Sequence, residues 1–146
     1  MPEKETVERA KKDKREGKAA STQAGEFVRE EIEHVREGKH GARSTKQAIA
    51  IGLSKARRAG VNLSPPKNAS KETREQAARD SRKGKTPGKG KTSAKRSRAT
   101  LAALKREGHS AASKKALSRQ AHKAAAKRSA ASRSRSAKKA AATRKK

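Results

Sequence analysis

The sequence predicts a mostly α-helical protein with extensive disorder, in which a short helical hairpin head precedes a basic tail that forms isolated helices. Hydrophobic residues make up only 29% of the 146 residues and aromatic residues 1%, so little material is available for a core. Charged residues reach 38% and the formal net charge is +28, a balance typical of disordered chains. Most of the large apolar residues lie between residues 27 and 63, where they recur at helical spacing.

The positive charge increases along the chain. Residues 1–37 carry 9 Lys/Arg and 10 Asp/Glu, residues 38–81 carry 10 and 3, and residues 82–146 carry 23 and 1. A balanced segment can pair its charges internally, but the last segment has only Glu107 with which to do so. The basic segment therefore points to a polyanion as partner, and nucleic acid is the most abundant candidate.

Residues 1–21 are expected to form a charged N-terminal helix. Acidic and basic residues alternate there at helical spacing, which allows the i,i+4 pairs Glu5–Arg9 and Glu8–Lys12.

Residues 22–63 are expected to form a helical hairpin mini-domain. In its first helix, 24–37, a narrow apolar stripe lies on an otherwise acidic surface and consists of Val28, Ile32 and Val35, with Phe27 beside it. The second helix, 45–59, carries a stripe made of Ile49, Leu53 and Ala56. A unit of about 40 residues is near the lower limit for independent folding, so marginal stability is expected, relieved either by dimerisation or by binding a partner.

The boundaries of these helices are marked by caps. Ser44 and Gln47 have the spacing of a capping box, and Gly60 lies where a helix normally ends. The segments KREGKAAST (14–22), VREGKHGARST (35–45) and KREGHSAAS (105–113) share Arg-Glu-Gly followed by small residues and a Ser or Thr. This echo predicts a reused joint of helix end, glycine cap, loop and next N-cap.

The rest of the chain is expected to be a linker, 64–96, and a basic histone-like tail, 97–146. A polar helix is expected in the linker over residues 67–82. In the tail, apolar residues at helical spacing predict two short helices, one with Leu101 and Leu104 and one with Leu117, Ala121 and Ala124.

Candidate nucleic-acid-binding residues follow from the excess of cations. Lys115, Arg119, Lys123 and Lys127 recur every fourth residue and would form a basic stripe that can follow phosphates. The full set is Lys114, Lys115, Arg119, Lys123, Lys127, Arg128, Arg133, Arg135, Lys138, Lys139, Arg57 and Arg58. Readers of single strands stack bases on aromatic rings, and Phe27 is the one aromatic residue, so duplex backbone is the expected target.

Catalytic, cofactor and metal sites are not expected. The segment GKTPGKGKTS resembles a phosphate-binding loop but has Lys85 where that motif needs glycine. The four histidines, His34, His40, His109 and His122, have neither cysteine partners nor close ligand spacing. A chain with so little core has little from which to build an enzyme pocket, and a small-molecule substrate is not expected.

The stretch EFVREEIEHVREGKHGARSTKQAIAIGLSKARRAG, residues 26–60, resembles a bacterial family of small basic proteins built on a domain of unknown function. The hallmark of that family is similar to KQAIAIGLS followed by alanine, basic residues and glycine, and the likeness extends over residues 1–65. The tail resembles those of longer family members and, in composition, a linker-histone tail. The resemblance implies a DNA-associated bacterial protein and carries over no site residues.

These observations predict a non-enzymatic, nucleoid-associated, cytoplasmic protein that binds and compacts duplex DNA without reading its sequence. One alternative is an RNA- or ribosome-associated assembly factor, because rRNA phosphates attract the same charges. Another is a protein-interaction module tethered by its tail. A homodimer through residues 22–63 would use Ile49, Ile51 and Leu53, and no membrane segment is expected.

Overall fold

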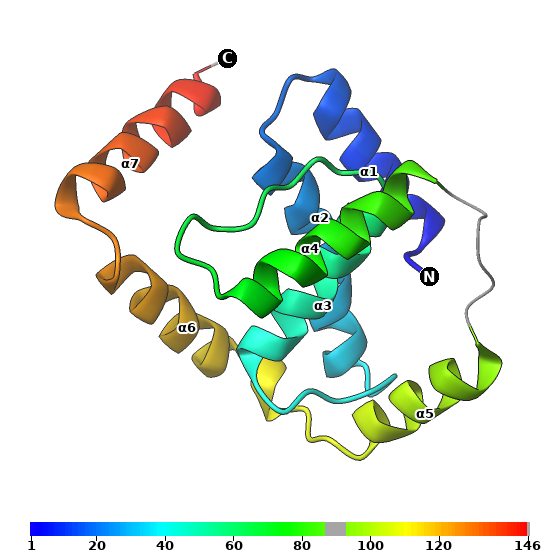
Figure 1. Cartoon of the computed structure of the whole chain (residues 1–146). Coiled ribbons are helices and arrows are strands. Elements are labelled where there is room, and N and C mark those ends of the chain that lie inside the picture. The colour runs from blue at the N-terminus through cyan, green and yellow to red at the C-terminus, as the bar shows by residue number, and fades with distance from the viewer. Residues whose placement is uncertain (87–92, 146) are drawn as a thin grey trace.

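A computed structural model describes residues 1–86 and 93–145, and all the regular structure in these residues is helical (Figure 1). The elements are α1 (Lys4–Arg15), α2 (Ala20–Arg36), α3 (Thr45–Arg58), α4 (Lys71–Lys85), α5 (Ala94–Lys105), the 3-10 turn η1 (Ser110–Ala112), α6 (Lys114–Ala126) and α7 (Ala130–Arg144). None of the described helices is both long and apolar enough to cross a bilayer. The extensive disorder expected from composition is not seen in the described residues, because the Ala-rich segments form helices without needing a core.

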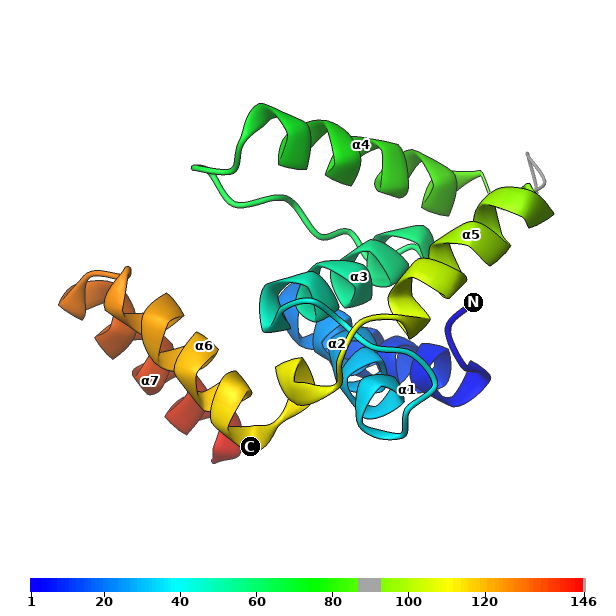
Figure 2. The same ribbon diagram turned by 90° about the horizontal axis from the view of Figure 1, so that it is seen from below.

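The first four helices form a stack in chain order (Figure 2). The expected hairpin is confirmed, since α2 and α3 are antiparallel neighbours and make the most extensive contact in the described chain. α1 packs on the other side of α2, and α4 packs on the other side of α3. The head is therefore larger than the hairpin alone, which gives it more surface to bury than residues 22–63 provide.

Small residues form the contact between α2 and α3. The buried positions on α3 include Ala48, Gly52 and Ala56, each one turn apart. A Cβ atom on Gly52 would lie 2.6 Å from the Cα atom of Val28, so only glycine allows the two backbones to come this close. The expected stripe is confirmed only in part: Ala56 is buried and Leu53 packs against the core, but both Leu53 and Ile49 are only half-buried.

Two apolar clusters flank this contact. One joins α1, α2 and the end of α3 and consists of Ala10, Ala24, Phe27, Ala56 and Val61. The other contains Ile32, Val35, Ala42, Ala48, Ala111 and Ala112, so part of the basic tail enters the core of the head.

α4 is fixed to α3 by a buried carboxylate. The expected polar helix of the linker is found at Lys71–Lys85, and its Asp80 side chain is 1% exposed. Ser54 Oγ and Arg58 Nε of α3 each donate to this carboxylate at 2.7 Å, and Gln76 donates from within α4. Burial alone would raise the pKa of Asp80, but these hydrogen bonds outweigh it and hold the pKa below its usual value.

A helix ends at each of the three Arg-Glu-Gly motifs as expected, but only the first two have the expected glycine cap. Gly17 and Gly38 have φ values of 72° and 74°, and the amides that follow them bond back to the last helical turn. Gly108 does not adopt a positive φ. Its carbonyl instead accepts a hydrogen bond from Ala42 N in the head.

The expected caps and ion pairs are largely present. Ser44 accepts from Gln47 N at 3.2 Å, although the Gln47 side chain accepts from Arg43 N rather than from Ser44 N. The pair Glu5–Arg9 forms. Lys12 lies 3.9 Å from Glu16 instead of pairing with Glu8.

Replacing Gly52 with alanine should lower the free energy of unfolding by about 1–3 kcal/mol, because the new methyl group overlaps the backbone of α2. Gly25→Ala is the matched control. Gly25 is also inside a helix, but a Cβ atom there meets nothing within 4 Å, so this change should stabilise by about 0.5–1 kcal/mol. Urea denaturation of both variants tests the contact, and equal effects would contradict it.

Replacing Asp80 with asparagine should lower the free energy of unfolding by about 1.5–3 kcal/mol at pH 7, because charged hydrogen bonds to α3 are lost. The folded-state pKa is lowered, so this contribution is present above the unfolded pKa of about 4 and is lost as pH falls through the folded value. The difference between wild type and variant should therefore close below about pH 4. Glu75→Gln, an exposed change on the same helix, should have no such effect.

Candidate nucleic-acid interface

The basic tail is attached to the head at the loop between α2 and α3. Gly41 N donates to Leu104 O at 2.9 Å, and Ala42 N donates to Gly108 O at 3.0 Å. A Cβ atom on Gly41 would lie 1.9 Å from the carbonyl oxygen of Glu107, so this contact requires glycine. Backbone hydrogen bonds thus join the end of α5 to the head.

The turn η1 is the second point of attachment. Thr45 Oγ1 donates to Ala111 O at 2.7 Å, and Arg36 Nε donates to Ala112 O at 2.8 Å. Ala111 and Ala112 are 7% and 0% exposed, respectively. The sequence analysis missed this attachment, because two alanines before a serine carry no periodic signal.

Serine caps define the two helices that follow η1. Ser113 accepts from Ala116 N and Ser129 accepts from Ser132 N, both at 3.2 Å. α6 contacts η1 and the start of α3, with Leu117 packed against the cluster that contains Ala112. α7 buries none of its residues and lies apart from the stack (Figure 1). The tail thus ends in a docked helix followed by a free one.

The candidate cations of the tail all lie at the surface. Ten of the residues expected to bind nucleic acid are on α6, on α7 or between them, and every one is exposed: Lys114, Lys115, Arg119, Lys123, Lys127, Arg128, Arg133, Arg135, Lys138 and Lys139. The sequence has no acidic residue after Glu107. Glu107 itself lies 3.8 Å from Arg43 of the head. The cations of α6 and α7 therefore have no acid of their own segment with which to pair.

A shallow hollow of about 380 Å³ gathers three lysines from two elements. Lys46 from the first turn of α3 and Lys123 and Lys127 from α6 surround it, with Gln120 and alanines completing the lining. Ammonium groups around an open hollow suit a phosphate group. Lys46 was missed by the sequence analysis, since it lies 77 residues from Lys123 and only the docking of α6 joins them.

The two candidates from the head lie elsewhere. Arg57 is 7% exposed, and its Nε donates to Leu63 O at 3.0 Å. Arg58 is half-exposed and holds Asp80 of α4. Both guanidinium groups serve contacts within the head, and neither joins the basic surface of α6. Ile49, Ile51 and Leu53 are each half-buried, and a homodimer through them stays a prediction.

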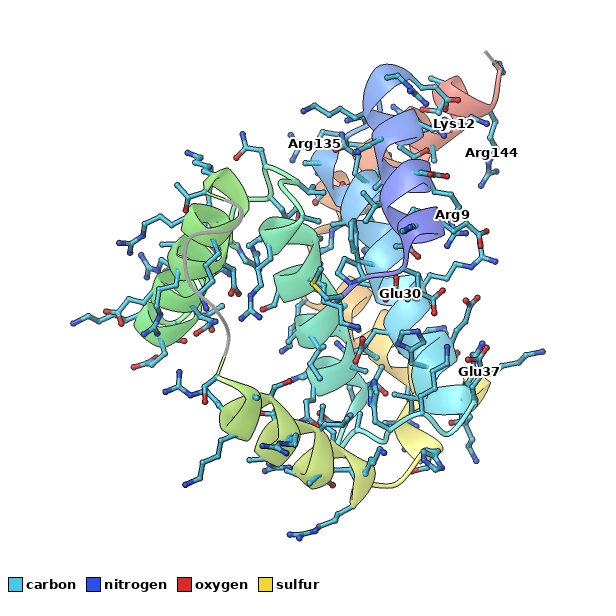
Figure 3. The ribbon with its side chains drawn as sticks, turned by 90° about the vertical axis from the view of Figure 1, so that its right-hand side faces the viewer. Arg9, Lys12, Glu30, Glu37, Arg135 and Arg144 are labelled. Carbon is cyan, nitrogen blue, oxygen red and sulfur yellow. The ribbon has the colours of Figure 1, made fainter. Side chains whose placement is uncertain are left out.

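Cations of the head differ from those of the tail because acids surround them. Arg9 contacts Glu26 at 2.6 Å, and Lys18 contacts Asp13 at 2.7 Å. The hydrogen bonds to Asp13 and Glu16 raise the pKa of Lys18. In Figure 3, Arg9 projects from α1 and the acids Glu30 and Glu37 lie on α2 and at its end, whereas Arg135 and Arg144 extend from α7.

Comparison with known proteins gives one match, which covers the head. Residues 3–68 match the model of a family of unknown function, DUF6496, a range that includes α1, α2 and α3. This confirms the expected likeness to a family built on a domain of unknown function. No curated protein matches the chain, and no solved structure does. Over residues 3–68, the chain is similar to family DUF6496.

Proposed function

We propose that this protein is a non-enzymatic, nucleoid-associated protein that binds duplex DNA without reading its sequence. In this proposal, α6 and α7 neutralise backbone phosphates, and the head holds α6 in place. The observation that carries the proposal is the set of ten exposed cations on and between α6 and α7, in a segment that has no acidic residue after Glu107. A charged surface that only contacts water normally carries both signs of charge.

The distribution of charge supports a polyanion as partner. The head pairs many of its cations with its own carboxylates, at distances such as the 2.6 Å between Arg9 and Glu26. The tail has no acids left for this purpose, so its self-repulsion is relieved only by anions from outside. The hollow between Lys46, Lys123 and Lys127 offers one site at which a phosphate could dock against both head and tail.

The absence of an accessible aromatic ring supports duplex rather than single-stranded nucleic acid. Phe27 is the one aromatic residue of the chain, and it is 1% exposed in the core of the head. Bases of a single strand would therefore find no ring on which to stack. A duplex presents its phosphates in regular order, and contacts to them need only cations.

Neutralising substitutions are a better test than removal of the tail. Deletion of the whole tail would also remove Ala111 and Ala112, which are part of the core of the head. Exchange of exposed lysine and arginine for glutamine leaves these residues in place. Circular dichroism can verify that each variant keeps its helices.

Replacing four cations of α6 with glutamine should weaken binding to duplex DNA and flatten its salt dependence. The variant carries Lys115→Gln, Arg119→Gln, Lys123→Gln and Lys127→Gln. Each lost phosphate contact reduces the magnitude of the negative slope of log K against log salt by about 0.9, so the slope should become less steep by about 3 to 4. The measurement is fluorescence anisotropy with a duplex of mixed sequence over a salt series.

The matched control removes the same amount of charge from α1, through Lys4→Gln, Lys11→Gln, Lys14→Gln and Arg15→Gln. These side chains are also exposed, but they lie in a segment of balanced charge. The slope should therefore change by less than about 0.9, the amount for one phosphate contact. Equal losses in the two variants would mean that net charge alone acts and would contradict an interface on α6. Tighter binding of duplex RNA than of duplex DNA would instead support a role in RNA or ribosome assembly.

A further inference from the structure

The fold brings together three potential metal ligands that the sequence keeps apart. Glu31 and His34 lie one turn apart on α2, and His40 lies in the loop that follows. One possible ligand atom of each lies within 4.8 Å of the others. The side chains of Glu31, His40 and His34 are only 1%, 9% and 13% exposed. Spacing in the sequence does not reveal this grouping, in which the ring centres of the two histidines are 6.2 Å apart.

Hydrogen bonds fix how the two imidazole rings are protonated. His40 Nδ1 lies 2.9 Å from the carbonyl oxygen of Gly41, which can only accept, so Nδ1 carries a proton and Nε2 holds a lone pair in the neutral ring. His34 Nε2 lies 3.1 Å from the carboxylate of Glu3. Metal-bound histidines usually donate their other ring N–H to a carbonyl or carboxylate in this way.

The contact between His40 and Glu31 is close but is not a well-aligned hydrogen bond. His40 Nε2 lies 3.0 Å from Glu31 Oε1, yet this oxygen accepts no aligned hydrogen bond from the described residues, whereas Oε2 contacts the ammonium group of Lys55 at 2.6 Å. Ligands of one tetrahedral metal ion, each about 2.0–2.1 Å from it, are about 3.3 Å apart and point at the ion rather than at each other. The contact between His40 and Glu31 is short but lacks hydrogen-bond alignment, as expected for two ligands of one metal ion.

The carboxylates around the site outnumber the ammonium groups that pair with them. Glu30 and Glu31 are both buried, and one ammonium group, that of Lys55, lies between them at 3.5 Å and 2.6 Å. Glu3 adds a third carboxylate beside His34. Buried carboxylates are normally paired or bound to metal. Lys39 pairs with Glu3 at 3.3 Å, so three carboxylates face two ammonium groups, and the one negative charge that remains favours a bound cation.

We propose that Glu31, His34 and His40 bind one divalent transition-metal ion of the Zn²⁺ class, with Glu3 orienting the ring of His34. Two imidazoles and a carboxylate favour such an ion over Mg²⁺ or Ca²⁺, which prefer oxygen ligands alone. The ion would join the end of α2 to the loop that holds Gly41. Because Gly41 binds the end of α5, the site would stabilise the loop to which the basic tail is attached.

Binding is tested on the metal-stripped, nuclease-treated full-length protein, so that nucleic acid contributes no metal. Calorimetric titration should show one equivalent of Zn²⁺ bound, and thermal unfolding should move to higher temperature with Zn²⁺ but not with Mg²⁺. Co²⁺ should give the visible absorption of a low-coordinate site with nitrogen ligands. The absence of stoichiometric binding by the unmodified protein would overturn the proposal.

The four histidines supply a matched pair of variants. His34→Gln with His40→Gln should weaken Zn²⁺ binding by more than the roughly 10- to 100-fold typical of changes to outer-shell partners. His109→Gln with His122→Gln removes as many imidazoles outside the site and should leave binding unchanged. Equal loss in both variants would overturn the site.

Glu31→Gln tests the carboxylate in case the histidine variant unfolds. It preserves the shape of the side chain and should weaken Zn²⁺ binding as strongly as the loss of a ligand. Glu3→Gln should cost roughly 10- to 100-fold, the range for an orienting partner. Unchanged Zn²⁺ affinity in Glu31→Gln would contradict the proposal. These measurements use no nucleic acid, so their outcome is separate from that of the DNA-binding test.

Discussion

The close approach of α2 and α3 is the contact on which the rest of the structure depends. Gly52 allows the backbone of α3 to lie against that of α2 near Val28, and Ala48 and Ala56 continue the same face one turn away in each direction. With so few large apolar residues, the chain cannot fill a wide gap between helices. Small residues remove the gap instead, so that a small volume of side chains still yields a close-packed core.

Several features follow from this one contact. It fixes the connecting loop, where Gly41 and Ala42 pair with backbone carbonyls of residues 104 and 108. It also brings Lys55 of α3 onto the buried acids of α2. On its other side, α3 offers Ser54 and Arg58 to the carboxylate of Asp80. The connecting loop and α4 are thus held largely by polar contacts at defined positions, whereas α1 and η1 also bury apolar residues against the hairpin.

The charges divide the molecule into two parts with different requirements. Carboxylates and cations of the head compensate one another, whereas the cations of α6 and α7 have no acidic residue in their own segment. The tail is attached to the head at two points. Gly41 and Ala42 bond to the end of α5 through backbone, and Ala111 and Ala112 add two buried methyl groups and two further hydrogen bonds. Such hydrogen bonds contribute about 0.5–1.5 kcal/mol each, so the attachment depends on a few contacts at defined positions. The head can thereby orient α6 while the surface of α6 stays open.

Local sequence determined the helices and many of their ends. Capping serines such as Ser44, the glycines at 17, 38 and 60, and the apolar spacing of α2 depend on neighbours within a few residues, and these expectations agree with the structure. The excess of basic residues in the tail was equally visible, because charge is a property of composition.

Only the tertiary structure decided which residues meet across the chain. The buried face of α3 includes alanine and glycine, which matter because their small side chains let the two helices come close together. Apolar periodicity does not detect such residues. The insertion of Ala111 and Ala112 into the head, the gathering of Lys46 with Lys123, and the grouping of Glu31 with two histidines all join distant segments. Local patterns fix the helices, but contacts between helices depend on how closely backbones can approach, and that is settled only when the whole chain packs.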